Sequence, residues 1–267
     1  MQSVPSIFVS IASYRDPELI PTLHDMINTA ERPENLNIAI FWQNDNDINT
    51  FLNQGMQLIE RTTHQGYPLY QLEYNRARVS VLSVHYYESR GACWARHMAE
   101  TLFQDEAFFL QIDSHCRFIP HWDHEMIAML DSLRAESPKP ILSSYPPAYE
   151  PGENEIRKDY VSRMIFNLFT QEGIVQMLST TITETAPVRC GYLAGGLFLV
   201  TVVLPERCPT IPIFSLLAKK LPWQRVPLPM AMTFTPHTKF CSGISIPARS
   251  TVRFGQITIM KPKKRVQ

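Results

Sequence analysis

The sequence predicts an α/β fold built on an open, mostly parallel β-sheet flanked by helices. Short runs of apolar and β-branched residues, typical of buried strands, recur along the first part of the chain. Amphipathic stretches with helical spacing separate several of these runs. The chain also opens in the order strand, helix, strand, which favours parallel strands joined by right-handed crossovers.

The first three elements follow from local sequence signals. The run SIFVSIAS (6–13) predicts the first strand. Asp16 is typical of a helix N-cap, Pro17 of the first helical position and Glu18 of the positive end of a helix. Apolar residues then recur at helical spacing, and LNIAIFWQ (36–43) predicts the second strand.

The alternation continues beyond a polar loop. Further strands are predicted at 79–86, 106–113 and 140–146, with helices in 89–103 and in the stretch WDHEMIAMLDSLR. In open α/β sheets, ligands bind at the carboxyl ends of the strands. The residues that follow the strands at 6–13 and 106–113 are therefore the candidates for a binding site.

Composition narrows the class of protein. The chain has 267 residues, and its 25 Lys and Arg balance 25 Asp and Glu, so the overall charge predicts neither a nucleic-acid nor a membrane partner. The N-terminal stretch MQSVPSIFVS lacks the pattern of a signal peptide. Five cysteines without tight spacing are typical of free thiols in a reducing compartment. We therefore expect a cytoplasmic protein.

Asp113 and His115 flank Ser114 where the strand at 106–113 ends. Residues two apart on a strand face the same side, and a carboxylate with an imidazole can hold a divalent cation. Such a cation would neutralise the charge of a diphosphate leaving group. The structural alternative is an Asp that caps a turn beside a packed histidine, because short patterns of this kind recur by chance.

A zinc site is a second alternative at the same place. Zinc prefers nitrogen and sulfur ligands, and the segment contains His115, Cys116, His121 and His124. The spacing of these residues matches no familiar zinc module. A zinc hydrolase is therefore the less favoured interpretation.

Three further groups stand near predicted strand ends or loops. Tyr14 and Arg15 follow the first strand, where the ring can stack on a base or cover the sheet edge. Arg90 and Arg96 can meet phosphate oxygens or form a solvated pair on their helix. The glycines of GYLAGGLF (191–198) allow a backbone to approach a ligand closely, or make a simple turn.

Taken together, four separated blocks are more specific than any one of them. They are IFVSIASYRDPEL (7–19), SRGACWARH (89–97), LQIDSHCRF (110–118) with the following WD, and LAGG (193–196). In this order they resemble the glycosyltransferase family of the cytoplasmic N-acetylglucosaminyltransferase that modifies hydroxyproline of a ubiquitin-ligase adaptor. The resemblance covers roughly residues 1–196.

The resemblance implies a GT-A type, Rossmann-like fold that binds UDP-GlcNAc with a divalent cation, Mn²⁺ or Mg²⁺. It also implies a retaining transfer to a protein hydroxyl, and assigns no catalytic residue in this chain. By the resemblance, Asp113 and His115 are metal ligands, and Asp113 also belongs to the donor site. Ser13, Tyr14 and Arg15 would lie near the nucleotide. Arg90 and Arg96 would line the donor pocket, and Gly195 and Gly196 would lie beside the sugar or the acceptor.

The resemblance ends after LAGG. The family continues with a Tyr-Asp-Pro segment and Gly-Glu-Glu, Thr-His-Gly-Tyr and Trp-His blocks, which this sequence lacks. From Arg207 to Gln267 the chain has eleven Lys or Arg, eight Pro and no acid. Codons permitted for 209–244 can also spell those family blocks in another phase. We infer that the reading frame slipped between Gly196 and Pro209, in the gene or in its recorded sequence.

This inference divides the chain into two parts. Residues 1–196 are predicted to form an incomplete nucleotide-sugar-binding domain, and 197–267 an irregular, Pro-rich basic tail that is poorly ordered. A genuine basic tail for nucleic acid or anionic lipid is the alternative. The favoured function is glycosyl transfer. The alternative is a catalytically dead protein that binds a sugar nucleotide, because the acidic residues and the histidine of the family's C-terminal blocks are absent.

Overall fold

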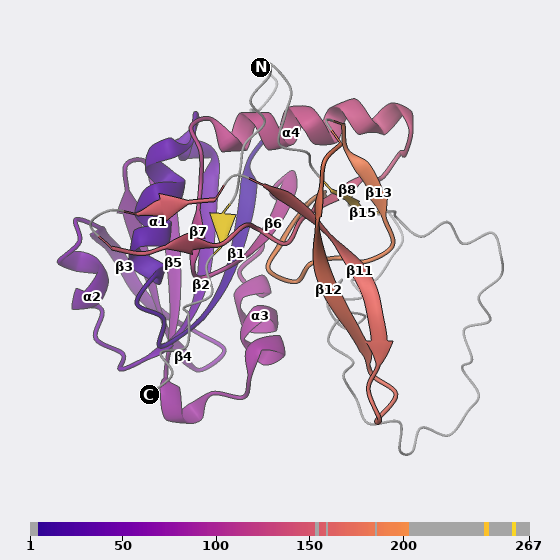
Figure 1. The fold of residues 1–267 in the computed structure, drawn as a ribbon. Coiled ribbons are helices and arrows are strands. Elements are labelled where there is room, and N and C mark those ends of the chain that lie inside the picture. The colour runs from indigo at the N-terminus through magenta and orange to yellow at the C-terminus, as the bar shows by residue number, and fades with distance from the viewer. Residues whose placement is uncertain are drawn as a thin grey trace, which may run out of the picture.

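A ten-stranded sheet runs through the protein (Figure 1). The computed structural model describes residues 5–152, 155–158, 160–184, 186–202, 243–245 and 258–259. The centre of the sheet is parallel and consists, in spatial order, of β6 (Phe108–Asp113), β1 (Ile7–Tyr14), β2 (Leu36–Asn44) and β5 (Ala77–His85). The predicted α/β class with a parallel sheet is confirmed.

Antiparallel pairing extends the sheet beyond this centre. Next to β5 lie β4 (Tyr67–Tyr74) and β3 (Gln57–His64). Next to β6 lies β14 (Leu197–Thr201), which is antiparallel to both β6 and β8 (Ile141–Ser143). Beyond β8 come β15 (Gly243–Ser245), parallel to β8, and β13 (Val188–Cys190). The sheet is therefore mixed, with its parallel strands in the middle.

Helices cover both faces of the central strands. Val9 and Ile11 of β1 belong to the cluster that includes buried residues of α1 (Leu19–Thr29) and α4 (Trp122–Ser132). On the opposite face, Phe41 of β2 packs with buried residues of α3 (Ala92–Glu100). Because both faces are buried, the central strands carry nearly continuous apolar runs, which explains why the sequence predicted them.

The start of α1 differs from the prediction. The helix begins at Leu19, with Glu18 at the N-cap position, instead of at Pro17. Pro21 lies in the first turn, where its missing N–H removes no helical hydrogen bond. Asp16 accepts a hydrogen bond from the Glu18 amide at 2.9 Å, but its second carboxylate oxygen has other partners, described below.

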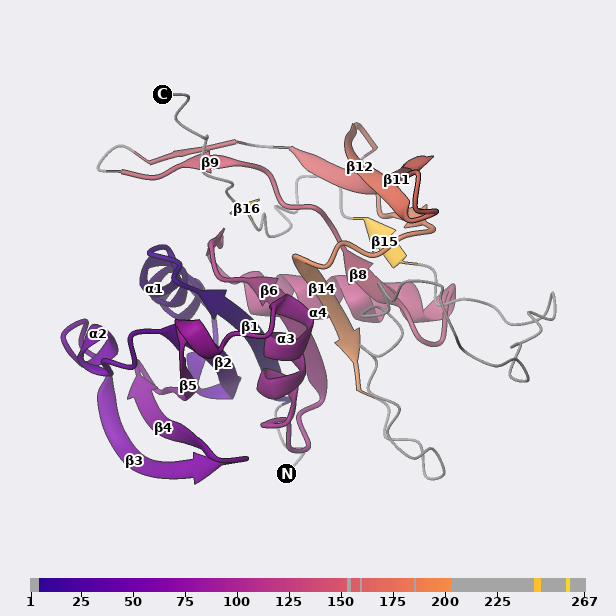
Figure 2. The ribbon, with the colours of Figure 1, turned by 90° about the horizontal axis from the view of Figure 1, so that it is seen from below.

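The remaining elements are short or peripheral. Two hairpins that the sequence analysis did not predict are β3–β4 and the pair β11 (Val161–Phe169) and β12 (Val175–Ile182), which extends away from the central sheet (Figures 1 and 2). The short elements are α2 (Asn49–Leu52), β7 (Cys116–Arg117), β9 (Tyr149–Glu150), β10 (Ile156–Arg157), β16 (Thr258–Ile259) and the 3₁₀ turns Pro33–Asn35, Tyr86–Glu88 and Leu133–Ala135.

The division predicted at Gly196 falls just before a strand of the sheet, since β14 begins at Leu197. The tail also contributes β15 and β16, which pair with β8 and β7. The predicted poor order of the rest of the tail concerns residues outside the described ranges. Among the helices within those ranges, none has the length and apolar character that a membrane span requires.

Candidate functional site

The carboxyl edge of the parallel strands gathers most of the predicted site residues. β1 ends at Tyr14 and β6 at Asp113, and the two strands pair in parallel register. β14 runs antiparallel to β6, so the loop that precedes Leu197 returns to the same edge. The helix α3 begins at Ala92 and leads into β6, which brings its amino end to this edge as well.

Asp113 is the last residue of β6 and is held from two sides. Its Oδ1 accepts a hydrogen bond from Nη2 of Arg96 at 3.1 Å, and its amide donates to the Gly196 carbonyl at 3.1 Å. The Asp113 side chain is 34 % exposed and that of Arg96 25 %. The carboxylate is therefore fixed in place yet reachable by a ligand.

His115 contacts a different acid, Asp16, which follows β1. The imidazole Nδ1 lies 2.8 Å from Asp16 Oδ2, and Ser114 Oγ donates to the same oxygen at 2.6 Å. Because β6 ends at Asp113, the alternation expected to align Asp113 with His115 does not extend to the histidine. The two side chains have separate partners, Arg96 and Asp16, and the His115 side chain is 26 % exposed.

The contacts between Asp16 and His115 stabilise the charged form of each. Burial raises the pKa of Asp16, but hydrogen bonds from His115 and Ser114 outweigh it and leave that pKa below the usual value. Burial lowers the pKa of His115, but the hydrogen bond and charge of Asp16 outweigh it and leave that pKa above the usual value. The charges of Asp113 and Glu18 act in the same direction on the imidazole.

A cavity of about 330 Å³ opens at this edge of the sheet. Its lining comes from the end of β1, the end of β2 and the start of α3. The residues are Ala12, Tyr14, Gln43, Ser89, Gly91 and Ala92. The buried Gln43 side chain donates to the Ser13 carbonyl at 3.2 Å and accepts from Ser89 Oγ at 2.6 Å, which fixes the amide on the floor of the cavity.

Two arginines are neighbours in the sequence of residues that line this cavity. The Arg15 guanidinium lies 4.5 Å from the ring centroid of Tyr86, and the Arg90 guanidinium 5.3 Å from that of Trp94. Tyr14 is 53 % exposed and lines the cavity, and its stacking on a base stays a prediction. Ser13 is fully buried on the other face of β1, and among the described residues its hydroxyl has no hydrogen-bond partner.

The glycines of the LAGG loop contact the same residues. The Gly195 carbonyl accepts a hydrogen bond from the Gln111 side chain. A Cβ at Gly195 would lie 3.3 Å from Nη1 of Arg96, so glycine lets the guanidinium pass close to the backbone on its way to Asp113. The structure thus brings together Arg96, Asp113, Gly195 and Gly196.

The donor atoms fit a cation only if a ligand completes its coordination. In the described part of the chain, no group of three or more His, Cys, Asp or Glu side chains could hold a metal ion. Asp113 and His115 still offer one carboxylate and one imidazole. Mg²⁺ is commonly bound through one or two carboxylates together with substrate phosphates, so a cation beside Asp113 and His115 would need further oxygen ligands from a bound diphosphate.

The residues suggested for a zinc hydrolase do not form such a site. Cys116 is fully buried, its thiol contacts the Asp113 carbonyl, and burial raises the pKa of that thiol well above its usual value. His121 is 64 % exposed and lies 3.6 Å from a Glu31 oxygen instead. The zinc alternative therefore has no ligand cluster among the described residues.

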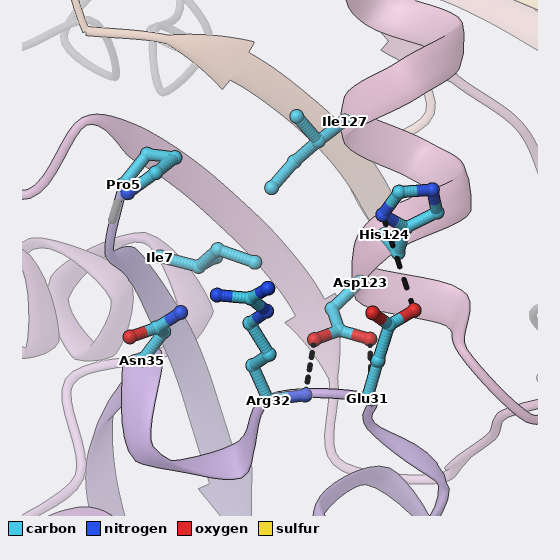
Figure 3. Close-up of a pocket in the computed structure, with 8 residues that line it drawn as sticks. All are labelled: Pro5, Ile7, Glu31, Arg32, Asn35, Asp123, His124 and Ile127. Atoms are coloured by element: carbon cyan, nitrogen blue, oxygen red, sulfur yellow. Dashed lines mark hydrogen bonds and ion pairs between the residues drawn. The ribbon is translucent and has the colours of Figure 1, made fainter. Parts of the chain in front are cut away.

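A second cavity, of about 230 Å³, lies at the amino ends of β1 and β2 (Figure 3). Figure 3 shows the Asp123 carboxylate among the lining residues, where it accepts hydrogen bonds from the backbone amides of Glu31 and Arg32, 2.8 and 3.0 Å long. These bonds tie α4 to the chain segment after α1. Asp123 thus has a clear structural role at the edge of the sheet opposite Asp113.

Sequence reasoning missed three residues of the candidate site. Asp16 was interpreted only as a helix cap, and its partners Ser114 and His115 lie about a hundred positions away. Gln43 carries no motif of its own, and Ser89 begins the block SRGACWARH, in which only Arg90 and Arg96 were interpreted. Gln43 ends a predicted strand, however, and the rule that ligands bind at carboxyl strand ends would have identified it.

Comparisons with known proteins assign this chain to a family. The model of the family described as Glycosyltransferase (GlcNAc) matches residues 6–216, which extends past Gly196. No curated protein matches the chain. The match to the specific hydroxyproline-modifying transferases therefore stays a prediction.

Solved structures show weaker similarity. A crystal structure of GalNAc-T7 with UDP, GalNAc and Mn²⁺ is 15 % identical, with a TM-score of 0.49 over 75 % of this chain and 36 % of that one. S. aureus TarS 1-349 in complex with UDP-GlcNAc is 12 % identical, with a TM-score of 0.39 over 58 % of this chain and 38 % of that one. This chain thus spans little more than a third of the structures it matches. The family model covers most of the chain, residues 6–216, and by that match the protein belongs to the Glycosyltransferase (GlcNAc) family.

Proposed function

We propose that the protein binds UDP-GlcNAc at the carboxyl edge of β1 and β6 and transfers GlcNAc to a hydroxyl of a protein acceptor. The observation that carries the proposal is the convergence on one edge of Asp113, His115, Arg96 and the LAGG loop beside a cavity of about 330 Å³. The family membership supports sugar transfer. UDP-GlcNAc, the protein acceptor and a GT-A type of fold come from the motif resemblance.

Different residues of the chain would bind different parts of the donor. The cavity between Tyr14, Gln43 and the start of α3 would hold the nucleoside, with Tyr14 stacking on the base. Arg15 and Arg90 rest on aromatic rings, and no carboxylate partner of either is found among the described residues. Their positive charges therefore remain available to attract an anionic donor.

Asp113 and His115 would hold the divalent cation, Mn²⁺ or Mg²⁺. When bound, such a cation neutralises the diphosphate and helps UDP to depart. Arg96 keeps the Asp113 carboxylate in position and adds a positive charge near the leaving group. Gly195 lets that guanidinium, and a ligand beside it, approach the backbone closely.

UDP affinity with and without Mn²⁺ tests this proposal. We expect Mn²⁺ to tighten UDP binding to the wild-type protein, and Asp113→Ala to remove most of that gain, about tenfold or more, because one of two protein ligands is lost. Asp131→Ala is the matched control, since this exposed acid lies on α4 and, among the described residues, its ion pair is with Arg134. Equal metal-dependent binding by all three proteins would contradict the assigned site.

A second measurement separates a transferase from a protein that only binds the donor. Release of UDP from UDP-GlcNAc, with Mn²⁺ and a hydroxyl-bearing acceptor peptide, should be measurable for the wild type and lost in Asp113→Ala. Tight UDP binding without any UDP release would instead support the catalytically dead alternative.

A further inference from the structure

Asp16 occupies a position that its role as a turn residue does not explain. It follows β1 directly after Arg15, and its side chain is only 17 % exposed. Oδ1 accepts from the Glu18 amide at 2.9 Å, which accounts for the turn into α1. Oδ2 is not needed for that turn, and it faces the segment after β6, where Ser114 Oγ and His115 Nδ1 lie 2.6 and 2.8 Å away.

These contacts determine which nitrogen of His115 is free. A carboxylate can only accept hydrogen bonds, so Nδ1 must carry the proton that it shares with Asp16. Within the described residues, no hydrogen bond or ion pair involves His115 Nε2. The ring is therefore anchored through Nδ1, with Nε2 as the nitrogen left to bind a ligand.

We propose that Asp16 is a positioning residue that holds His115 by Nδ1–H and so presents Nε2 to the cation of a cation–diphosphate complex. The inference rests on the function proposed above. Carboxylates that hold the second nitrogen of a metal-binding histidine fix its tautomer and orientation, and their loss weakens metal affinity by about 10- to 100-fold. Asp16 itself does not contact the substrate.

The variant Asp16→Asn tests this role with little change of shape. Both oxygens of Asp16 are acceptors, whereas Asn replaces one of them with an NH₂ group, so it cannot satisfy both Glu18 and the Ser114–His115 pair. We expect the gain in UDP affinity on adding Mn²⁺ to fall at least tenfold, while metal-free UDP affinity changes less than about twofold.

Asp123→Asn is the matched control for effects on the fold. Asp123 is also a buried carboxylate that accepts backbone N–H bonds, but it lies at the opposite edge of the sheet. The control should lower the melting temperature and leave the Mn²⁺-dependent gain intact. An Asp16→Asn protein that keeps the full gain, or loses metal-free and metal-dependent binding equally, would overturn the positioning role.

The outcomes also distinguish this inference from the proposed function. A wild-type protein that binds UDP no better with Mn²⁺ overturns both, whereas normal wild-type behaviour with an unaffected Asp16→Asn protein overturns only the role of Asp16. A further measurement needs no variant. Imidazole ¹⁵N chemical shifts of His115 in wild-type protein, above the pKa of the ring, should show the proton on Nδ1, and a proton on Nε2 would refute the inference.

Discussion

At the scale of single residues, Glu100 is the most perturbed acid next to the candidate site. It lies at the end of α3, one turn after Arg96, and its Oε1 is buried without a hydrogen-bond partner among the described residues. Burial raises the pKa of Glu100 to about 8, although the nearby charge of Arg96 acts in the opposite direction. The folded protein therefore binds a proton at Glu100 that the unfolded chain releases near its usual pKa of 4.5.

This difference predicts a pH-dependent stability. The contribution of Glu100 to the free energy of unfolding is fully favourable below about pH 4.5 and is lost as pH rises through about 8. Because solvent partly reaches the carboxyl, we expect a loss of about 2 kcal/mol, well below the full linkage value. Replacing the acid with a neutral amide, Glu100→Gln, should remove this loss.

Urea unfolding of wild type and Glu100→Gln near pH 5 and near pH 9 measures the effect. The variant should be more stable than wild type by about 1–2 kcal/mol at the higher pH and similar to it at the lower pH. Glu60→Gln, an exposed position on β3, serves as the control and should show no such difference. A Glu100→Gln protein that gains nothing at high pH would show that the carboxyl is well solvated.

The sequence predicted those site residues that belong to a recognisable motif. Asp113, Arg96 and the LAGG glycines stood in blocks whose spacing or resemblance singled them out, and the fold brings them into contact. The contact of Asp16 with His115 joins segments about a hundred positions apart. A cap signature explained Asp16 locally, so nothing in the sequence pointed to its second partner.

At the scale of elements, burial explains most of the strands that were predicted, although the buried, apolar strand β14 was missed. The central strands are buried on both faces, and their apolar runs stand out in the sequence. Strand β3 is exposed along almost its whole length, and β12 along most of it, so neither shows an apolar alternation. The hairpin turn between β3 and β4 did leave a signal, the pair Gln65–Gly66.

Gly66 gives a test of that turn. Gln65 and Gly66 both have positive φ, 51° and 85°, as a two-residue hairpin turn of this hand requires. A Cβ at Gly66 would meet no atom within 4 Å, so any cost of Gly66→Ala comes from the backbone alone. We expect about 1 kcal/mol or more of lost stability in urea unfolding.

Gly191→Ala is the matched control for this change. A Cβ at Gly191 also meets no atom within 4 Å, but its φ is not positive, so little change is expected. Equal stability of the two variants would contradict the turn geometry.

At the scale of the whole molecule, Arg117 joins segments far apart in the chain. Its side chain is 5 % exposed and pairs with Glu18 before α1 and with Glu155, whose Oε2 lies 2.7 Å from Nε. The guanidinium also lies 4.1 Å from the ring centroid of Tyr149. One buried charge thus connects β7, the start of α1 and the segment around β9 and β10.

Arg117→Met should therefore destabilise the fold strongly. The substitution keeps much of the apolar stem but removes the buried cation that Glu18 and Glu155 share, which we expect to cost about 3 kcal/mol or more in urea unfolding. Arg189→Met is the control, because Arg189 and Glu136 are 67 % and 64 % exposed and 3.7 Å apart. Its cost should stay below about 1 kcal/mol, and equal costs for the two variants would refute the network's importance.

The C-terminal part of the chain bears on the proposed change of reading frame. The family model matches through residue 216, whereas the motif blocks end at Gly196, and the proposed change of reading frame lies between Gly196 and Pro209. The nucleotide sequence across codons 190 to 245 tests that hypothesis. Codons incompatible with the second phase would eliminate it.

The most direct test of the central claim is to locate Mn²⁺ in the presence of UDP by paramagnetic broadening of backbone amide signals. The account predicts that the amides of Ser114, His115 and Gly195 broaden first, while those of Asp123 and His124 at the opposite edge of the sheet stay sharp. Broadening centred on Asp123 and His124, or none that depends on UDP, would contradict a donor site at the carboxyl ends of β1 and β6.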